Sequence, residues 1–167
     1  IFVACIFRRY RRCATLNTGF FVIMPYAAPV TEQLFVLKHI SGIDVLSESA
    51  RFADASPDMV KAIVEGLGAF ANAEFAPLNH IGDAVGARIV NGEVQMPNGY
   101  RQAYQAYVDG GWGAINAPVE FGGMGLPFSL ATVALDSLGG GNMAFTLCPM
   151  LSVGALESVA HNKSKKQ

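Results

Sequence analysis

The chain has 167 residues, of which 51% are hydrophobic, and its formal net charge at pH 7 is −1. A chain of this length can bury a core as a single domain, and no apolar run reaches the roughly 20 residues that a membrane-spanning helix needs. The mean hydropathy of +0.33 is high for a free-standing domain. It indicates apolar faces that another protein or chain segment covers.

Charge divides the chain into an acidic body and two basic ends. All 13 acidic residues lie between Met24 and Ala160, together with five of the 12 basic residues. We expect residues 1–23 to be an extension foreign to the domain, such as upstream sequence read in frame, with an arginine-rich presequence or a lipid-binding segment as alternatives. Residues 162–167 are expected to form a basic tail. Tyr10 is the one aromatic residue among these basic clusters, so no nucleic-acid groove is predicted. The basic residues of the two ends are Arg8, Arg9, Arg11, Arg12, Lys163, Lys165 and Lys166.

The cysteines and histidines show no metal-binding spacing. Cys5, Cys13 and Cys148 are odd in number and include no C-x-x-C pair, so neither a disulfide framework nor a zinc site is expected. The histidines are scattered along the chain, and no metal ligand is predicted among them. A reducing, cytoplasmic setting is the default for such a sequence.

Apolar residues at helical spacing predict the first elements. Thr31 is placed to cap a first helix that stops at Gly42. A stronger signal begins at Ser56-Pro57-Asp58, where a capping hydroxyl, a first-turn proline and a first-turn carboxylate stand in order. We expect this amphipathic helix to be buried on one side and to end at Pro77. Its apolar positions are Val60, Ile63, Val64, Leu67, Phe70 and Ala71.

Between Arg88 and Gln95 the pattern changes to that of a small β-hairpin. Asn91-Gly92 stands between short β-favouring runs, which is typical of a tight type I′ turn. Beyond it, apolar and aromatic residues recur at helical steps up to Gly110. We interpret this stripe as core packing, with ligand stacking as the alternative. Its members are Tyr100, Ala103, Tyr104 and Tyr107.

A loop rich in glycine and proline extends from Gly110 to Pro127. Glycine permits positive φ and close backbone approach, and proline fixes φ, so the loop is expected to be stiff and specifically shaped. It lacks the Gly-Lys-Ser/Thr ending of a phosphate-binding loop. No histidine or second acid lies near its carboxylate in sequence, so acid–base chemistry is not predicted there. The residues to which we assign a structural role in this loop are Trp112, Glu120, Gly122, Gly123 and Gly125.

Two further helices are expected at the end of the chain. The first, from Pro127 to Leu138, is apolar nearly all round and therefore requires cover on several sides. Glycines 139–141 are expected to form a flexible turn, after which Asn142 caps a helix that Pro149 kinks or divides.

The glycine spacing of residues 139–144 matches a dinucleotide-binding fingerprint in form. A true fingerprint follows a β-strand and is followed by an acid about 20 residues later. Neither condition is met, so we reject nucleotide binding there. No set of nucleophile, base and orienting residue can be assembled either, and no catalytic residue is predicted.

Several motifs together resemble the N-terminal helical domain of acyl-CoA dehydrogenases, in the branch that includes the 3-methylmercaptopropionyl-CoA dehydrogenases. They occur in the family's order and extend from Met24 to about His161. After His161 the chain departs from the family pattern, which favours a truncation or frameshift. The motifs are Met24-Pro-Tyr-Ala-Ala-Pro29, Phe35-Val-Leu37, Ala76-Pro-Leu-Asn-His-Ile-Gly-Asp83, Gly99-Tyr-Arg-Gln-Ala-Tyr104, Gly110-Gly-Trp112, Pro118-Val-Glu-Phe-Gly-Gly-Met-Gly-Leu-Pro127 and Asn142-Met-Ala-Phe145.

The resemblance implies a mostly α-helical fold with one small β-hairpin, formed by a domain of residues 24–161. It implies a parent flavoprotein of the fatty-acid-metabolism type, in which a glutamate removes the α-proton of an acyl-CoA thioester and FAD takes the β-hydride. It further implies an electron-transfer flavoprotein as partner and a homo-oligomeric parent. The family's flavin-binding middle domain and base-bearing C-terminal domain have no counterpart here. We therefore expect a fragment that binds no FAD and is inactive alone.

The same resemblance assigns a pocket wall to the last helix. By analogy, Phe145, Leu147, Cys148 and Leu151 line the acyl-chain side of the substrate pocket, with plain packing between helices as the alternative. A different class of function also remains open, in which the chain is a helical interaction module that docks onto a partner through its exposed apolar faces.

Overall fold

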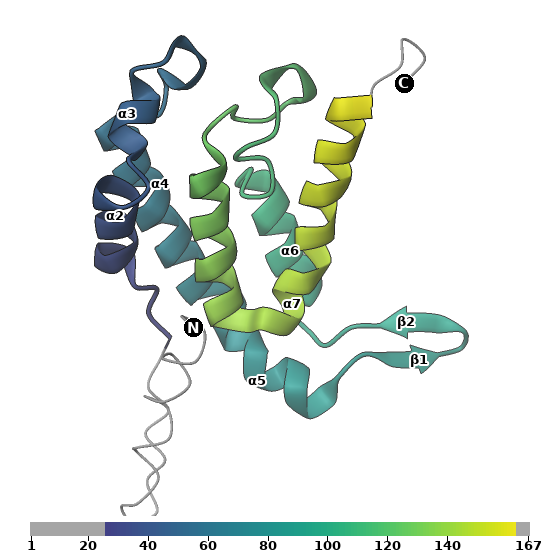
Figure 1. Cartoon of the computed structure of the whole chain (residues 1–167). Coiled ribbons are helices and arrows are strands. Elements are labelled where there is room, and N and C mark those ends of the chain that lie inside the picture. The colour runs from purple at the N-terminus through teal and green to yellow at the C-terminus, as the bar shows by residue number, and fades with distance from the viewer. Residues whose placement is uncertain (1–25, 163–167) are drawn as a thin grey trace, which may run out of the picture.

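The computed structural model describes residues 26–162. The predictions for residues 1–23 and for the lysines of the basic tail therefore lie outside the described residues. Within that range the protein is mostly α-helical with one two-stranded antiparallel hairpin, as predicted (Figure 1). In chain order the elements are α2 (Val30–His39), α3 (Ile43–Ser47), the 3-10 turn η2 (Ala50–Phe52), α4 (Pro57–Phe70), the π-helical turn η3 (Ala71–Phe75), α5 (Ala76–Val85), β1 (Arg88–Val90), β2 (Glu93–Gln95), α6 (Tyr100–Asp109), the 3-10 turn η4 (Val119–Phe121) and α7 (Phe128–Asn162).

The first helix begins before the expected cap. Helix α2 starts at Val30, and its N-cap residue Pro29 makes no side-chain capping bond. The carbonyl oxygen of Pro29 accepts a hydrogen bond from the backbone N–H of Gln33 (2.9 Å). The prediction that Thr31 caps this helix is wrong, because the first turn closes through the backbone and Thr31 already lies within it. Gly42 (φ +63°) follows the helix and is the N-cap residue of α3, a short helix that the apolar spacing did not predict.

Helix α4 begins as the sequence predicts. Ser56 is its N-cap, and the Ser56 hydroxyl accepts a hydrogen bond from the backbone N–H of Met59 (3.3 Å). This bond satisfies one of the N–H groups that a helix start leaves without an intrahelical partner. The predicted apolar face is buried at Val60, Ile63, Val64, Leu67 and Ala71.

The prediction that Pro77 ends this helix is wrong. The chain stays helical through α4, η3 and α5 because a π-helical turn precedes the proline. In that turn the backbone N–H of Ala76 donates to the carbonyl of Ala71, five residues back. The wider turn makes room for a proline ring that would press against a carbonyl in a regular helix. Pro77 then occupies the first turn of α5, where a missing N–H is tolerated.

The hairpin forms at the predicted position. Asn91 (φ +54°) and Gly92 (φ +83°) both adopt positive φ, as a type I′ turn requires. Val90 pairs with Glu93, and Ile89 pairs with Val94. The hairpin extends away from the helices (Figure 1), and every residue of both strands is exposed.

Helix α7 consists of two limbs that meet at Asn142. The backbone leaves the helical region there (φ −157°, ψ 91°), so residues 128–141 form a first limb and residues 143–162 a second limb running in a different direction (Figure 1). Asn142 Oδ1 accepts a hydrogen bond from the backbone N–H of Phe145 (3.0 Å), which confirms the predicted cap. Pro149 lies inside the second limb and does not divide it.

Glycines 139–141 are helical, so the predicted flexible turn is wrong. They permit close packing instead. A Cβ on Gly141 would lie 3.2 Å from the carbonyl oxygen of Ala71, and one on Gly140 would lie 2.7 Å from the hydroxyl of Tyr26. The break falls at Asn142 because its side chain caps the second limb, whereas the glycines are held against η3 and the start of the domain.

Two apolar clusters form the core. The first lies between α2, α3, α4 and the first limb of α7, and includes Leu37, Leu67 and Leu130. The second lies between η3, α5, α6 and the second limb, and centres on aromatic side chains, among them Phe75. Trp112 packs against both clusters. Among residues 26–162 no helix is long and apolar enough to cross a membrane.

Candidate functional site

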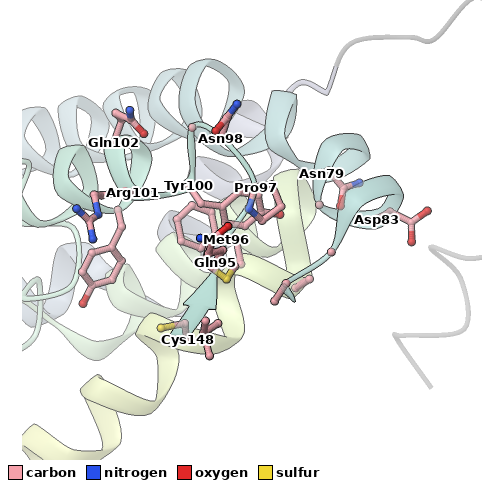
Figure 2. A pocket seen from close by; sticks show the side chains of 18 of the residues that line it. Asn79, Asp83, Gln95, Met96, Pro97, Asn98, Tyr100, Arg101, Gln102 and Cys148 are labelled. Atoms are coloured by element: carbon pink, nitrogen blue, oxygen red, sulfur yellow. The ribbon is translucent and has the colours of Figure 1, made fainter. Parts of the chain in front are cut away.

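An open groove lies between the end of α5, the hairpin, the start of α6 and the start of the second limb of α7 (Figure 2). Its volume of about 1370 Å³ exceeds the roughly 300–1,000 Å³ of ordinary ligand pockets. The groove is a trough open to solvent rather than a closed cavity. It brings together two segments that are far apart in the sequence, residues 79–104 and residues 144–148.

Phe145 and Cys148 form the α7 side of the groove. The Phe145 ring stacks on Phe75, with centroids 4.3 Å apart and planes 14° from parallel, and it contacts Tyr100 at 4.8 Å. Phe145 is 7% exposed, so this wall is fixed by the core behind it. Cys148 stands one turn further along and is exposed.

Two of the four predicted pocket-wall residues lie elsewhere on the second limb. Leu147 and Leu151 are 51% and 73% exposed, and neither lines the groove. Met143 is also exposed, at 61%. These three side chains follow one another at four-residue steps, so they share one apolar face of the limb.

The groove rim carries charges of both signs. Asp83 comes from α5, Glu93 from β2 and Arg101 from α6. A mixed rim provides no single-sign field for a charged ligand. Within the described part of the chain, no three histidine, cysteine or acidic side chains are placed to hold a metal ion.

The predicted aromatic stripe of α6 divides between core and groove. Tyr100 and Tyr107 are buried, at 6% each, and Tyr104 is 40% exposed. Tyr100 and Tyr104 line the groove, whereas Tyr107 does not. Burial raises the pKa of Tyr107 to about 12, with smaller contributions from Tyr104 and Cys148.

We expect the Tyr107 hydroxyl to make the protein less stable in alkali. A raised pKa in the folded state means that this contribution to stability is fully present below about pH 10 and is lost as the pH rises to about 12. Denaturant unfolding of the wild type and of Tyr107→Phe between pH 9 and 12 measures this pH-dependent contribution to the free energy of unfolding. The Phe variant should lose less stability over this interval. An identical loss in the two proteins would contradict the assignment.

The glycine-rich loop folds back on itself outside the groove. The backbone N–H groups of Met124 and Leu126 donate to the carbonyls of Ala114 and Ile115, each at 2.9 Å. Gly123 passes so close to Ala117 that a Cβ would overlap its carbonyl group. The two halves of the loop thus lie side by side and are hydrogen-bonded to each other. The loop therefore forms a stiff connection between α6 and α7.

The other loop residues singled out from the sequence have distinct places. Gly122 (φ +81°) and Gly125 (φ +65°) adopt the left-handed conformation that favours glycine. Trp112 anchors the loop in the core, where its ring lies 5.9 Å from that of Phe70. Glu120 is exposed in η4.

The sequence did not reveal the part of the groove that α5 and the hairpin provide. His80, Asp83, Gln95 and Met96 line it. The Asn-Gly turn located the hairpin, but a local turn signal does not specify which face of the domain the strands lie beside. These residues were therefore not candidates before the structure was known.

The sequence of this helical chain is similar to that of an acyl-CoA dehydrogenase, which is an oxidoreductase. That relative is 3-methylmercaptopropionyl-CoA dehydrogenase from Ruegeria pomeroyi, with 37% identity over 144 residues. The match covers 86% of this chain and 24% of the relative. It confirms the resemblance inferred from the motifs, and the chain spans about a quarter of the relative's length. No protein-family model matches the chain.

Proposed function

We propose that residues 24–161 are the N-terminal helical domain of an FAD-dependent acyl-CoA dehydrogenase. The identity of 37% over 86% of the chain supports this proposal. The parent reaction is the α,β-dehydrogenation of an acyl-CoA thioester, with electrons passing to an electron-transfer flavoprotein. We further propose a homo-oligomeric parent in the cytoplasm.

We propose that the described residues form no flavin site by themselves. The glycine spacing of residues 139–144 lies within helix α7 and its Asn142 break rather than between a strand and a helix, so it cannot hold a pyrophosphate at a strand-to-helix turn. We therefore assign no flavin contact to any described residue. In this proposal the cofactor and the catalytic base belong to other parts of the parent, and the chain alone is inactive.

In this proposal the second limb of α7 provides the residues with which the domain lines the substrate site. Phe145 and Cys148 line the groove, and Leu147 and Leu151 expose apolar side chains elsewhere on the same limb. Apolar area of this kind gains free energy when it is covered. We propose that these four residues form the acyl-chain side of a pocket that the rest of the parent completes.

A chimera tests the domain assignment. Residues 24–161 replace the matched segment of the Ruegeria enzyme, and a variant with that segment deleted is the control. The chimera should purify with a flavin absorption band and oxidise the enzyme's acyl-CoA substrate, and the deletion variant should do neither. A chimera that has native helix content and melts cooperatively but holds no flavin would contradict the proposal.

Flavin binding by the full 167-residue chain tests the part of the proposal that the chain alone holds no cofactor. Equilibrium dialysis against FAD should show no stoichiometric binding, and the purified chain should be colourless. A yellow preparation with one flavin per chain would overturn this part of the proposal.

The exposed face of the second limb also supports the alternative function, a helical module that docks onto another protein. The two functions differ in the chimera. A folded chimera without flavin, together with a chain that forms a complex of fixed stoichiometry by light scattering, would favour the docking module.

A further inference from the structure

The break in α7 is organised around one buried polar side chain. Asn142 is 1% exposed and lies where α7 changes direction. A buried amide is costly unless it is hydrogen-bonded. The bonds that it makes therefore indicate what holds the break in place.

The Asn142 side chain contacts three different elements. Its Oδ1 accepts the capping bond from the N–H of Phe145 at the start of the second limb. Its Nδ2 donates to the carbonyl of Phe75 in η3 (3.3 Å) and to the hydroxyl of Tyr100 in α6 (3.4 Å). The Tyr100 hydroxyl in turn donates to the carbonyl of Leu78 in α5 (3.3 Å).

These bonds have different structural consequences. The capping bond lies within the second limb, so it stabilises the start of that helix without fixing its direction. The donated bonds run between elements: one reaches η3, directly before α5, and the other reaches Tyr100, which lines the opposite side of the groove. Phe145 and Cys148 follow Asn142 by three and six residues, so a change in the direction of the second limb displaces both of them.

We propose that Asn142 is a positioning residue, which fixes the angle between the two limbs of α7 through its donated bonds and thereby sets the width of the groove. The bond to Tyr100 ends on a residue that lines the groove, and the bond to Phe75 ends in the π-helical turn that leads into α5. The inference concerns the shape of the chain itself and does not depend on the proposed dehydrogenase function.

Distance measurement across the groove tests the proposal in the full-length chain. Cys5 and Cys13 are replaced by serine, and spin labels are attached to Cys148 and to a cysteine introduced by Asp83→Cys on the opposite wall (Figure 2). Asn142→Ser keeps a capping oxygen but is too short to reach Phe75 and Tyr100. Pulsed electron paramagnetic resonance should show a broader distance distribution. For each hydrogen bond lost, the fraction of molecules in which the second limb has moved away from its wild-type distance to α5 should rise about fivefold.

Tyr100→Phe provides a second, milder variant. It removes the acceptor for Asn142 and the bond to Leu78 but keeps the ring that packs on Phe145. We expect a smaller broadening than in Asn142→Ser. If Asn142→Ser fails to fold, this variant decides the question, and an unchanged distance distribution would then contradict the proposal.

A control pair of labels separates a change in angle from general loosening. Lys61→Cys on α4 and Thr132→Cys on the first limb, in a background with Cys148→Ser, do not span the break. Their distance should be the same in the wild type, Asn142→Ser and Tyr100→Phe. Equal broadening in both pairs of labels would show general loosening of the fold rather than a change in angle, and would contradict the proposal. An unchanged groove distance in a folded Asn142→Ser protein would show that Asn142 acts as a helix cap only.

Discussion

Phe75→Ala is expected to lower the free energy of unfolding by about 3–5 kcal/mol. Phe75 is 0% exposed, and its ring contacts those of Phe70, Tyr107 and Phe145 at 5.5, 6.1 and 4.3 Å. These contacts join η3, α6 and the second limb of α7. Removing the ring leaves a cavity that the π-helical turn and its neighbours cannot close without moving one another.

Urea unfolding followed by circular dichroism measures this loss. Phe35→Ala is the control, because Phe35 is 58% exposed and its substitution should change the free energy of unfolding by about 0.5 kcal/mol or less. A loss below about 1 kcal/mol for Phe75→Ala would mean that the second cluster is not packed as described.

Gly123→Ala is expected to lower the free energy of unfolding by about 3 kcal/mol. The added Cβ would overlap the carbonyl of Ala117, which is backbone and cannot rotate away as a side chain can. Ala117 is itself held, since its carbonyl accepts a hydrogen bond from the N–H of Gly125 (2.9 Å). Relieving the overlap therefore breaks the loop's own hydrogen bonds and loosens the link between α6 and α7.

Gly154→Ala is the matched control for Gly123→Ala. Gly154 lies in the second limb of α7, and a Cβ there meets nothing within 4 Å. The same substitution should leave stability unchanged or raise it by roughly 0.5–1 kcal/mol, because alanine favours a helix over glycine. Thermal and urea unfolding of the two variants compare them. Equal stabilities would contradict the close approach at Gly123.

Features with a short-range cause were predictable from the sequence. The start of α4 needs a hydroxyl, a proline and an acid within three residues, and Ser56 caps it as predicted. The hairpin needs two residues that tolerate positive φ, and Asn91 and Gly92 provide them. In both cases the residues that determine the structure are neighbours in the chain.

The errors arose where distant residues decide the local structure. Pro77 reads as a helix terminator, but the π-helical turn ahead of it accommodates the ring. Glycines 139–141 read as a flexible turn, but they permit contact with Ala71 and Tyr26, far away in the sequence. The groove could not be predicted for the same reason, since residues 79–104 form one side of it and residues 144–148, far away in the sequence, form the other. Phe145 and Cys148 were named through the family resemblance, and their own sequence context carries no signal for a site.

The measurement that tests the central claim most directly is hydrogen–deuterium exchange of α7 in the isolated chain and in the chimera. The claim is that the second limb exposes apolar surface that the parent covers. Residues 128–141 pack in the core and should be protected in both proteins. Residues 150–162 follow the buried start of the second limb and are mostly exposed, so they should exchange more rapidly in the isolated chain than in the chimera. Equal protection of the second limb in both proteins would contradict the claim, because its exposed face would then need no further cover.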